Sequence, residues 1–486
     1  MIRKFLGDFA IYGVGDIIIK ATGFVTLPIY SRLLNVEGYG TWNLILAGVG
    51  MVSAVLVLGG DSAYIRFFFA AKTEDERQTI TSTWFSFLAL WSVVITLVCV
   101  AFSQPIAAWA LDQPESALLV ALGLLAAPVG LINALCAQTL RNQFRARPFV
   151  FWNVFSALLS VGGSLIGAVV FNFGVTGVLG GALIAGLIML PIRLWTIRSM
   201  LALRFSVPLL RQLLAYGVPL MPGSVAYWVF ASSDRLLLGQ LTDLAQVGLY
   251  AVANQIANLI GFLYGALGQA WVPRSTALYE TDRESAAPVF GQMLTYFLVL
   301  FGVMSVGITV FAPEIITVLS TPEFIPAAVA VGPLALGYVA YASTQVTSMS
   351  IMLTKKTYYL TILAWASAIL NVVLNLILIP QLGMVAAAWS TTLSYVFLTL
   401  AYLFISQRLW AIAYEVRRGL LCVALTVAFT LAATRLPQLD FVASIALKAG
   451  YCLLFAAALA LTGVLDRREW GAVSTLVRQV RARLAT

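Results

Sequence analysis

Residues 117–148 read ALLVALGLLAAPVGLINALCAQTLRNQFRARP, a mainly apolar run without a charged residue, followed by three arginines within seven positions. The run from 117 to 140 is long enough to cross a hydrocarbon core of about 30 Å as a helix. Similar runs recur along the whole chain, which is 61% hydrophobic and 10% charged, with a mean hydropathy of +0.94. The sequence therefore predicts an all-α integral membrane protein.

Apolar runs separated by polar residues, proline or glycine predict about 14 transmembrane helices. The runs are too long and too uniformly apolar for the alternating strands of a membrane β-barrel. The predicted spans are 9–33, 42–68, 81–103, 117–140, 150–171, 175–197, 212–238, 246–271, 290–312, 326–353, 358–379, 384–406, 418–434 and 442–464.

The basic residues predict the direction of the helices. Of the 29 Lys and Arg residues, 24 lie in alternate gaps, at the adjoining ends of the spans or at the two ends of the chain, all on one side of the predicted membrane. The gaps on the other side hold acidic residues but almost no Lys or Arg. Because Lys and Arg concentrate on the cytoplasmic side of membrane proteins, we expect both termini in the cytoplasm. The net charge of +9 is then a topology signal, and we expect no nucleic-acid partner.

Several kinds of chemistry are excluded by residue content. The chain contains no histidine, so Ser-His and Cys-His catalysis and imidazole metal sites are excluded. The four cysteines lie in apolar spans without the paired spacing of a disulfide or metal site. A Walker A phosphate loop is absent. We therefore expect no catalytic residue, no metal and no cofactor.

An internal repeat suggests two bundles. Tyr12-Gly13-Val14 precedes Arg32-Leu33-Leu34, and Tyr216-Gly217-Val218 precedes Arg235-Leu236-Leu237, at an offset of about 203 residues. Two six-helix bundles related by a pseudo-two-fold axis along the membrane normal are a transporter architecture. The predicted parts are an N-terminal six-helix bundle (1–198), a cytoplasmic linker (199–211), a C-terminal six-helix bundle (212–407), helices 13 and 14 (408–465) and a basic cytoplasmic tail (466–486) that rests on anionic lipid.

Charged residues inside predicted spans are the candidate site. An ionised side chain near mid-membrane costs roughly 2.5–3.5 kcal/mol on insertion scales. The first helix nevertheless carries Asp16 and Lys20, four residues apart on one face, and the second carries Asp61 with Arg66 at its inner end. Two interpretations stay open. Either these groups line a wet cavity between the bundles, or they form ion pairs that lock neighbouring helices.

The first helix of each predicted bundle also carries charge near its outer end. Arg32 lies there in the first half, and Asp234 and Arg235 lie there in the second. Each Arg either snorkels to the outer interface or shares a role with its repeat partner. Asn254 and Asn258 share a helix face, which fits either a cavity or interhelical hydrogen bonding. Arg435 and Lys448, which flank the last hairpin, are expected to be interface anchors.

The chain also resembles a known family. The resemblance is carried by PIYSRLL at 28–34 with Tyr39-Gly40, by LRNQFRARP at 140–148, by Pro219–Pro222 with Ser233–Arg235 and VGLY at 247–250, and by the helix count with its repeat. Together these features resemble the Wzx-type O-antigen and exopolysaccharide flippases of the multidrug/oligosaccharidyl-lipid/polysaccharide (MOP) exporter superfamily.

The resemblance implies a transporter, not an enzyme. Its expected function is to move an undecaprenyl-pyrophosphate-linked oligosaccharide from the cytoplasmic to the periplasmic or outer leaflet of a bacterial cytoplasmic (inner) membrane, by alternating access. Polysaccharide polymerase and chain-length machinery are the implied protein partners, with the lipid bilayer as the surrounding medium. An ion or the membrane potential is the expected driving force.

The resemblance also implies a cationic cavity. The candidate pyrophosphate and cavity residues are Lys20, Arg32, Arg66 and Arg235, with Arg141 and Arg145 at the inner mouth. The last two fit equally the ordinary excess of cytoplasmic positive charge. Asp16, Asp61 and Asp234 give the cavity mixed sign, either as charge partners or as holders of a coupling proton or sodium ion. Asn254 and Asn258 are candidate polar cavity residues.

Three alternatives remain. A multidrug or cation antiporter of the same superfamily would use Asp16, Asp61 or Asp234 against cationic drugs, but twelve helices and an acidic cavity would then be expected. A lipid II flippase of the superfamily differs only in its substrate. A membrane glycan polymerase or ligase would need a large periplasmic loop, whereas the outer loops here are all short.

Overall fold

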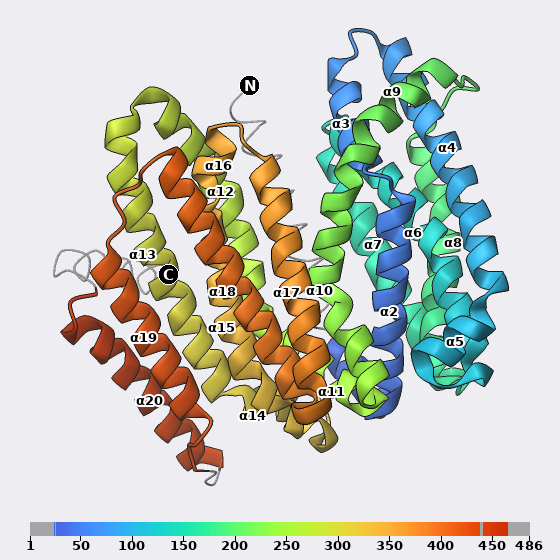
Figure 1. The fold of residues 1–486 in the computed structure, drawn as a ribbon. Helices are drawn as coiled ribbons and strands as arrows, with labels where there is room; N and C mark the ends of the chain where they lie inside the picture. Colours follow the sequence, from blue (N-terminus) through green and yellow to red (C-terminus); the bar gives the residue numbers. More distant parts are fainter. Residues whose placement is uncertain (1–23, 25, 438–440, 465–486) are drawn as a thin grey trace, which may run out of the picture. The chain divides into compact units, whose positions relative to one another are not determined.

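The computed structural model describes residues 24, 26–437 and 441–464, and every regular element among them is a helix. Figure 1 shows the elements in chain order. After a helical stretch at 26–33, the first half contains α2 (Val36–Leu56), α3 (Gly60–Ala70), α4 (Glu74–Ala101), α5 (Ser103–Leu111), η1 (Pro114–Ser116), α6 (Ala117–Asn142), α7 (Ala146–Leu165), η2 (Ile166–Val170), α8 (Gly174–Thr196), η3 (Arg198–Met200), α9 (Val207–Gly217), η4 (Val218–Leu220) and α10 (Met221–Leu241).

The second half is equally helical. It contains α11 (Leu244–Ala257), α12 (Leu259–Thr281), α13 (Arg283–Val310), α14 (Ala312–Leu319), η5 (Pro322–Ala327), α15 (Ala328–Thr347), α16 (Met349–Leu353), α17 (Tyr358–Leu382), α18 (Met384–Leu409), α19 (Val416–Ala433) and α20 (Phe441–Leu461). The expected basic tail at 466–486 lies outside the described residues.

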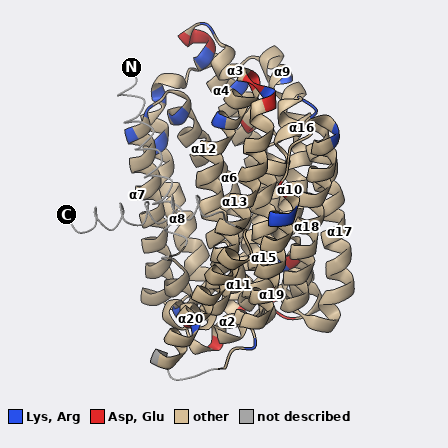
Figure 2. Cartoon of the chain, turned by 90° about the vertical axis from the view of Figure 1, so that its left-hand side faces the viewer, with Lys and Arg blue, Asp and Glu red and all other residues tan. Residues whose placement is uncertain are grey.

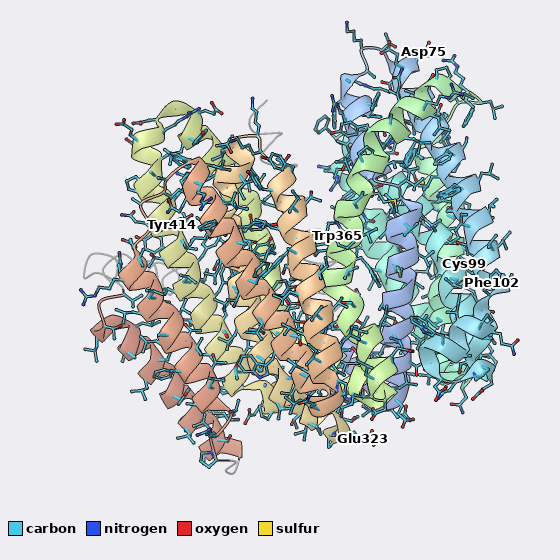
Figure 3. The ribbon with its side chains drawn as sticks, viewed as in Figure 1. Asp75, Cys99, Phe102, Glu323, Trp365 and Tyr414 are labelled. Carbon is cyan, nitrogen blue, oxygen red and sulfur yellow. The ribbon has the colours of Figure 1, made fainter. Side chains whose placement is uncertain are left out.

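Thirteen helical segments among the described residues are long and apolar enough to cross a membrane. They correspond in order to the second through fourteenth predicted spans, and residues 26–33 form the end of the first. Their outer faces are apolar. Phe102, at one end of α4, is 59% exposed, and the charged Asp75 lies at the other end of the same helix (Figure 3).

Contacts divide the chain into two compact units. The first takes the described residues up to Val252 together with Thr317–Ile325 and Ala364–Ala387. The second takes Ala253–Ile316, Pro326–Leu363 and the described residues from Ala388 onward. The contacts therefore group α10 and part of α17 with the first half of the chain.

Caps explain where the longest helices begin. Thr73 and Glu76 form a capping box at α4, in which each side chain bonds the backbone N–H of the other residue. Asp282 caps the start of α13, since its carboxylate accepts hydrogen bonds from the backbone N–H groups of Glu284 and Ser285. The Ser285 hydroxyl and these N–H groups lower the pKa of Asp282 below its ordinary value.

The backbone shows the internal repeat more clearly than the residue types do. Helices α4 and α13 both contain 28 residues, and each is followed by a short helix, a 3-10 turn and a long helix. Left-handed backbone recurs at matching places, at Phe144 and Lys355 and at Gly174 and Gly383. Gly383 follows Gly174 by 209 positions.

Some predicted spans are broken. The second span divides into α2 and α3 because Leu58 and Gly59 both have positive φ, at 51° and 65°. A Cβ atom on Gly59 would lie 2.1 Å from the carbonyl oxygen of Gly217, so only glycine allows this approach. The seventh span contains the 3-10 turn Val218–Leu220, where Pro219 cannot donate to a regular helix.

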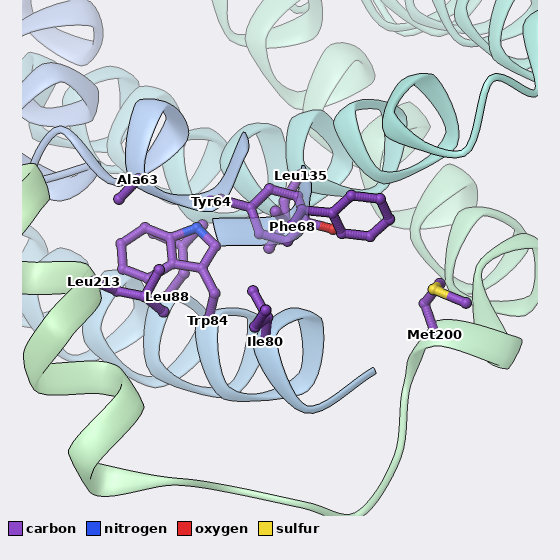
Figure 4. Close-up of a cluster of buried hydrophobic side chains, with 9 residues drawn as sticks. All are labelled: Ala63, Tyr64, Phe68, Ile80, Trp84, Leu88, Leu135, Met200 and Leu213. Carbon is purple, nitrogen blue, oxygen red and sulfur yellow. The ribbon is translucent and has the colours of Figure 1, made fainter. Parts of the chain in front are cut away.

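A hydrophobic cluster holds α3, α4 and α6 together in the first unit, with Met200 from η3 and Leu213 from α9 (Figure 4). Trp84 and Tyr64 are its largest fully buried members. The Tyr64 hydroxyl is satisfied inside the cluster by Thr81 and Thr139, at 3.1 and 2.9 Å. The cluster therefore fixes the ends of these helices, where several candidate residues lie.

Candidate functional site

Charged residues occur mainly at helix ends. Figure 2 shows basic and acidic residues gathered at the ends of α3, α4 and α9, while the middles of the helices are mostly uncharged. Of the predicted site residues, Asp16 and Lys20 lie outside the described residues. The others fall into the first unit, except Asn254 and Asn258, which belong to the second.

A buried polar cluster surrounds Asp234 in α10. Asp234 is 4% exposed and accepts hydrogen bonds from the Tyr250 hydroxyl and from the backbone N–H of Arg235. The neighbouring Ser233 hydroxyl is 3.2 Å from Asn371 Oδ1 on α17. Asn375 Nδ2 donates to the same oxygen at 3.1 Å. Asp234 thus makes polar contacts with α11, while the neighbouring Ser233 makes them with α17.

The cluster has a free acceptor. Asn371 and Asn375 are completely buried, and Asn375 Oδ1 has no hydrogen-bond partner among the described residues. Buried polar atoms rarely remain unpaired, because an unmade hydrogen bond is costly there. Oxygen atoms from a carboxylate, a hydroxyl and amides are also the donors that hard cations prefer. The amide and hydroxyl oxygens of Ser233, Asn371 and Asn375 are neutral donors of this kind.

Arg235 follows directly on α10. It is half-buried, and its Nε is buried with no hydrogen-bond partner among the described residues. Its repeat counterpart Arg32 is exposed and donates to Pro28 O at 3.3 Å and to Val318 O at 3.0 Å. The Arg32 guanidinium therefore satisfies a carbonyl in the last turn of α14, where a cation is favoured.

Four candidates lie at the ends of α3 and α6. Arg66 places its guanidinium 4.5 Å from the centre of the Tyr216 ring, a cation–π contact. Asp61, in the first turn of α3, is close enough to Arg141 for their charges to interact. Arg145 Nη1 donates to Thr196 O at 3.1 Å. These four residues lie at the same end of the first unit's helices but share no hydrogen bond or ion pair among the described residues.

Asn254 and Asn258 lie at the break between α11 and α12. Asn254 Oδ1 accepts from the Tyr338 hydroxyl at 3.0 Å, which is interhelical hydrogen bonding. Asn258 occupies the N-cap position of α12. Among the described residues there is no group of three His, Cys, Asp or Glu side chains that could hold a metal ion.

Two charged residues have partners that the sequence pattern did not predict. Arg193, at the cytoplasmic end of the predicted span 175–197, is 4% exposed inside α8 and donates to Asn133 O, Trp152 O and Asn153 Oδ1. Lys448, expected at an interface, is buried and paired with Glu314 at 2.5 Å. Asn371 and Asn375 could have been recognised from the sequence, since they form an (i, i+4) polar pair inside an apolar run.

The second unit contains a large apolar cavity of about 610 Å³ between α13, α15, α18 and α19. Its polar edge includes Thr295, Tyr414 and Glu415. Thr295 donates to Glu415 at 2.7 Å, and Glu415 pairs with Arg418 at 2.6 Å. Tyr414, which Figure 3 labels in the segment before α19, has a buried hydroxyl without a partner among the described residues.

The fold resembles those of known helical membrane transporters. It is similar to the lipid II flippase MurJ in an inward closed conformation, with a TM-score of 0.73 and 15% identity over 92% of this chain and 98% of that one. It is also similar to an inward-facing multidrug resistance transporter of the MATE family, with a TM-score of 0.65 and 15% identity over 82% and 93% of the two chains. The predicted fold class is thereby confirmed.

The family follows from the sequence comparisons. The chain belongs to the polysaccharide biosynthesis protein family, whose pattern it matches over residues 5–278, more than half its length. Residues 219–377 also match the MatE family. A curated relative is the succinoglycan biosynthesis transport protein ExoT of Rhizobium meliloti (strain 1021), 24% identical over 339 residues. That alignment covers 66% of this chain and 65% of the relative, so the chain spans just under two thirds of it.

Proposed function

We propose that the chain is a flippase for a lipid-linked oligosaccharide. The substrate is an undecaprenyl-pyrophosphate-linked glycan, moved from the cytoplasmic to the outer leaflet of a bacterial inner membrane. Membership of the polysaccharide biosynthesis family supports this class of substrate, as does the similarity to a succinoglycan transport protein. The termini lie in the cytoplasm, as the distribution of Lys and Arg indicates.

The observation that carries the proposal is Arg235. A guanidinium inside a membrane-length helix is costly, and the Nε of Arg235 is buried without a partner among the described residues. A pyrophosphate would supply the missing acceptor, because guanidinium groups bind phosphate oxygens strongly. Lys20, Arg32 and Arg66 are proposed to add positive charge along the same route, and Arg141 and Arg145 to act at its cytoplasmic mouth.

Transport proceeds by rocking of the bundle at 1–198 against the bundle at 212–407, as in other transporters built from parallel repeats. The glycan crosses in a wet cavity between the bundles. The polyprenyl chain stays in lipid, and the apolar cavity between α13, α15, α18 and α19 offers part of it a dry surface. Asn254 is proposed to line the polar part of the route.

Coupling is assigned to the cluster around Asp234. Its carboxylate, together with the oxygens of Ser233, Asn371 and Asn375, is proposed to hold the coupling sodium ion or proton. The membrane potential adds to the driving force. Each elementary charge that crosses 100 mV is worth about 2.3 kcal/mol, so outward movement of roughly two negative charges is favourable.

The test is transport of a fluorescent undecaprenyl-pyrophosphate-linked oligosaccharide in proteoliposomes. Arg235→Ala and Lys20→Ala should lower the initial rate at least about tenfold, the value expected for one lost charge-assisted contact. Arg435→Ala, which removes an exposed cation from the last hairpin, should transport normally. Wild-type rates in Arg235→Ala and Lys20→Ala would refute the proposed site.

A second candidate is flipping of lipid II, and the TM-score of 0.73 to a lipid II flippase favours it. The two substrates share the undecaprenyl pyrophosphate and differ in the sugar. Growth of cells that are depleted of their own lipid II flippase and carry this chain separates them. Rescue would support lipid II, and failure of rescue together with transport of the longer glycan would support the first proposal.

A further inference from the structure

A cavity of about 350 Å³ lies where α3 ends, between the first turn of α4 and the last turn of α6. Its polar lining includes Glu74, Arg77, Asn142 and Arg145, and three phenylalanine rings close its sides. All of these residues belong to the first unit. The cavity is separate from the cluster around Asp234 and shares only Arg145 with the proposed transport route.

The cavity contains hydrogen-bond donors without acceptors. Arg77 Nε and Asn142 Nδ2 are both buried and have no partner among the described residues. Asn142 as a residue is only 4% exposed. Since burial of unpaired donors is unfavourable, a ligand that accepts hydrogen bonds would stabilise the site.

The direction of the Asn142 amide is fixed by a chain of hydrogen bonds. Arg141 can only donate, so its contact places Gln138 Oε1 toward the guanidinium. Gln138 Nε2 then donates to Asn142 Oδ1 at 2.7 Å. Asn142 Nδ2 is therefore the amide atom left for a ligand. Arg141 acts here as a positioning residue.

The charges in the cavity select an anion. Arg77 and Arg145 contribute two guanidinium groups, and Glu74 contributes one carboxylate that pairs loosely with Arg77 at 3.5 Å. Three separate donors, from Arg77, Arg145 and Asn142, match the several oxygens of a phosphate group. Gln143 Oε1 is a buried acceptor without a partner among the described residues, which suits a hydroxyl group beside the phosphate.

One phenylalanine beside the cavity, Phe144, has an unusual backbone conformation at the end of α6 that does not itself require an aromatic side chain. Phe144 has a φ of +56° and is 70% exposed, a conformation that is unfavourable for a bulky residue. The matching cap in the second half uses Lys355, so the cap does not need an aromatic ring. The Phe144 and Phe69 rings lie 5.9 Å apart and are both exposed beside the cavity.

From these contacts we infer that the cavity bounded by Arg77, Asn142 and Arg145 binds a phosphate group. Where the ligand is anchored in lipid, the exposed rings of Phe69 and Phe144 contact its apolar part. Three sources share this chemistry: a soluble phosphate ester, the headgroup of an anionic phospholipid, and the pyrophosphate of the polyprenyl carrier.

The experiment uses the full chain in phosphatidylcholine nanodiscs. The soluble probes, glycerol 3-phosphate and inorganic phosphate, are titrated calorimetrically. Phosphatidylglycerol and undecaprenyl pyrophosphate are incorporated in separate discs, and native mass spectrometry counts the bound lipid. The probe that saturates one site identifies the source.

Arg145→Gln tests the site because Arg145 is exposed and its removal leaves the hydrophobic cluster intact. We expect binding at least about tenfold weaker, the effect of one lost charge-assisted hydrogen bond. Arg77→Gln should weaken the same probe. The matched control is Arg147→Gln, which removes an equally exposed cation outside the cavity and should change binding by less than about twofold.

Two outcomes would overturn the inference. One is failure of all the probes to bind the wild-type chain. The other is an equal loss in Arg145→Gln and Arg147→Gln, which would indicate diffuse attraction to basic residues. Either result leaves the transport assay of Arg235→Ala unaffected, so the two proposals fail separately.

Discussion

Gly40 and Gly248 each pack against the backbone of the other's helix. A Cβ atom on Gly40 of α2 would lie 1.9 Å from Leu244 O, and one on Gly248 of α11 would lie 2.2 Å from Val36 O. On each helix the contacted carbonyl belongs to the residue four positions before that helix's own glycine. Gly248 follows Gly40 by 208 positions, and Leu244 follows Val36 by the same distance. The crossing is therefore the same contact seen from both halves of the repeat, and small residues at both positions let the helices approach.

Substitution at this crossing should separate the two helices. We expect Gly40→Ala and Gly248→Ala to lower the free energy of unfolding by about 1–3 kcal/mol, the usual range for overpacking. Gly48→Ala is the matched control on α2, because a Cβ there meets nothing within 4 Å. It should be neutral or slightly stabilising, since alanine favours helices. Thermal unfolding of the purified proteins measures the difference, and equal stability of Gly40→Ala and Gly48→Ala would contradict the contact.

Arg193 should be important for stability although it has no acidic partner in the described part of the chain. Its guanidinium donates to three oxygens from α6 and α7, at 2.9–3.2 Å. Replacement by methionine would leave these hydrogen bonds unmade, at a cost of about 3 kcal/mol. Arg198→Met removes an exposed cation that only stacks on Trp195, and it should cost little. Denaturant titration in detergent would compare them, and the account of Arg193 fails if both variants unfold alike.

The spans were predictable because membrane helices need a fixed length of apolar residues, and that length is a local property. The break at Leu58-Gly59 was not predictable, since it depends on the close approach of Gly217, far along the chain. The same holds for Arg32, whose acceptor Val318 is 286 positions away. The sequence counted Arg193 only as one of the cytoplasmic cations, because the pattern of charges does not show which cations find buried acceptors.

The candidate site was predictable in part for the same reason. Asp234 and Arg235 stand out locally as charges in an apolar run, and the structure places both in α10. The sequence could not show that Ser233 reaches Asn371 on α17, since 138 positions separate them. The roles of Asp234 and Arg235 in transport stay predictions.

Coupling through Asp234 gives a sharp expectation. Asp234→Asn keeps the shape of the side chain but removes its negative charge, so the cluster should lose its affinity for a cation. We expect transport in proteoliposomes to become insensitive to a sodium or proton gradient and to fall at least about tenfold. Asp243→Asn is the control, because Asp243 is exposed and only accepts from the Gln246 backbone N–H. A gradient response that persists in Asp234→Asn would assign coupling elsewhere.

Removal of the buried amide tests the same cluster without a change of charge. Asn375→Leu deletes the unpaired Oδ1 and the hydrogen bond to Asn371. The expected result is a higher sodium or proton concentration for half-maximal transport, with an unchanged maximal rate if folding is normal. Measurement of the transport rate against ion concentration separates the half-maximal concentration from the maximal rate. A lower maximal rate at unchanged ion dependence would indicate a purely structural amide.

The ion pair between Glu314 and Lys448 predicts a pH dependence of stability. Glu314 Oε1 accepts from Lys448 at 2.5 Å and from Ser444 at 3.0 Å, which ties α20 to α14. Burial raises the pKa of Glu314, whereas these hydrogen bonds lower it by a larger amount. The net pKa of Glu314 therefore lies below the ordinary value of 4.5. A carboxylate with a depressed pKa stabilises the folded state above its unfolded pKa, and this contribution is lost as the pH falls through the folded pKa.

Wild-type protein should therefore melt at a higher temperature than Glu314→Gln at pH 7, and the gap should shrink as the pH falls below about 4.5. Glu323→Gln provides the control, since Glu323 is an exposed carboxylate in η5 and its loss should change the melting temperature little at any pH. Differential scanning fluorimetry between pH 3.5 and pH 7 would measure the three proteins. If the gap between wild type and Glu314→Gln stays constant over this range, the contribution of Glu314 comes from packing and not from its charge.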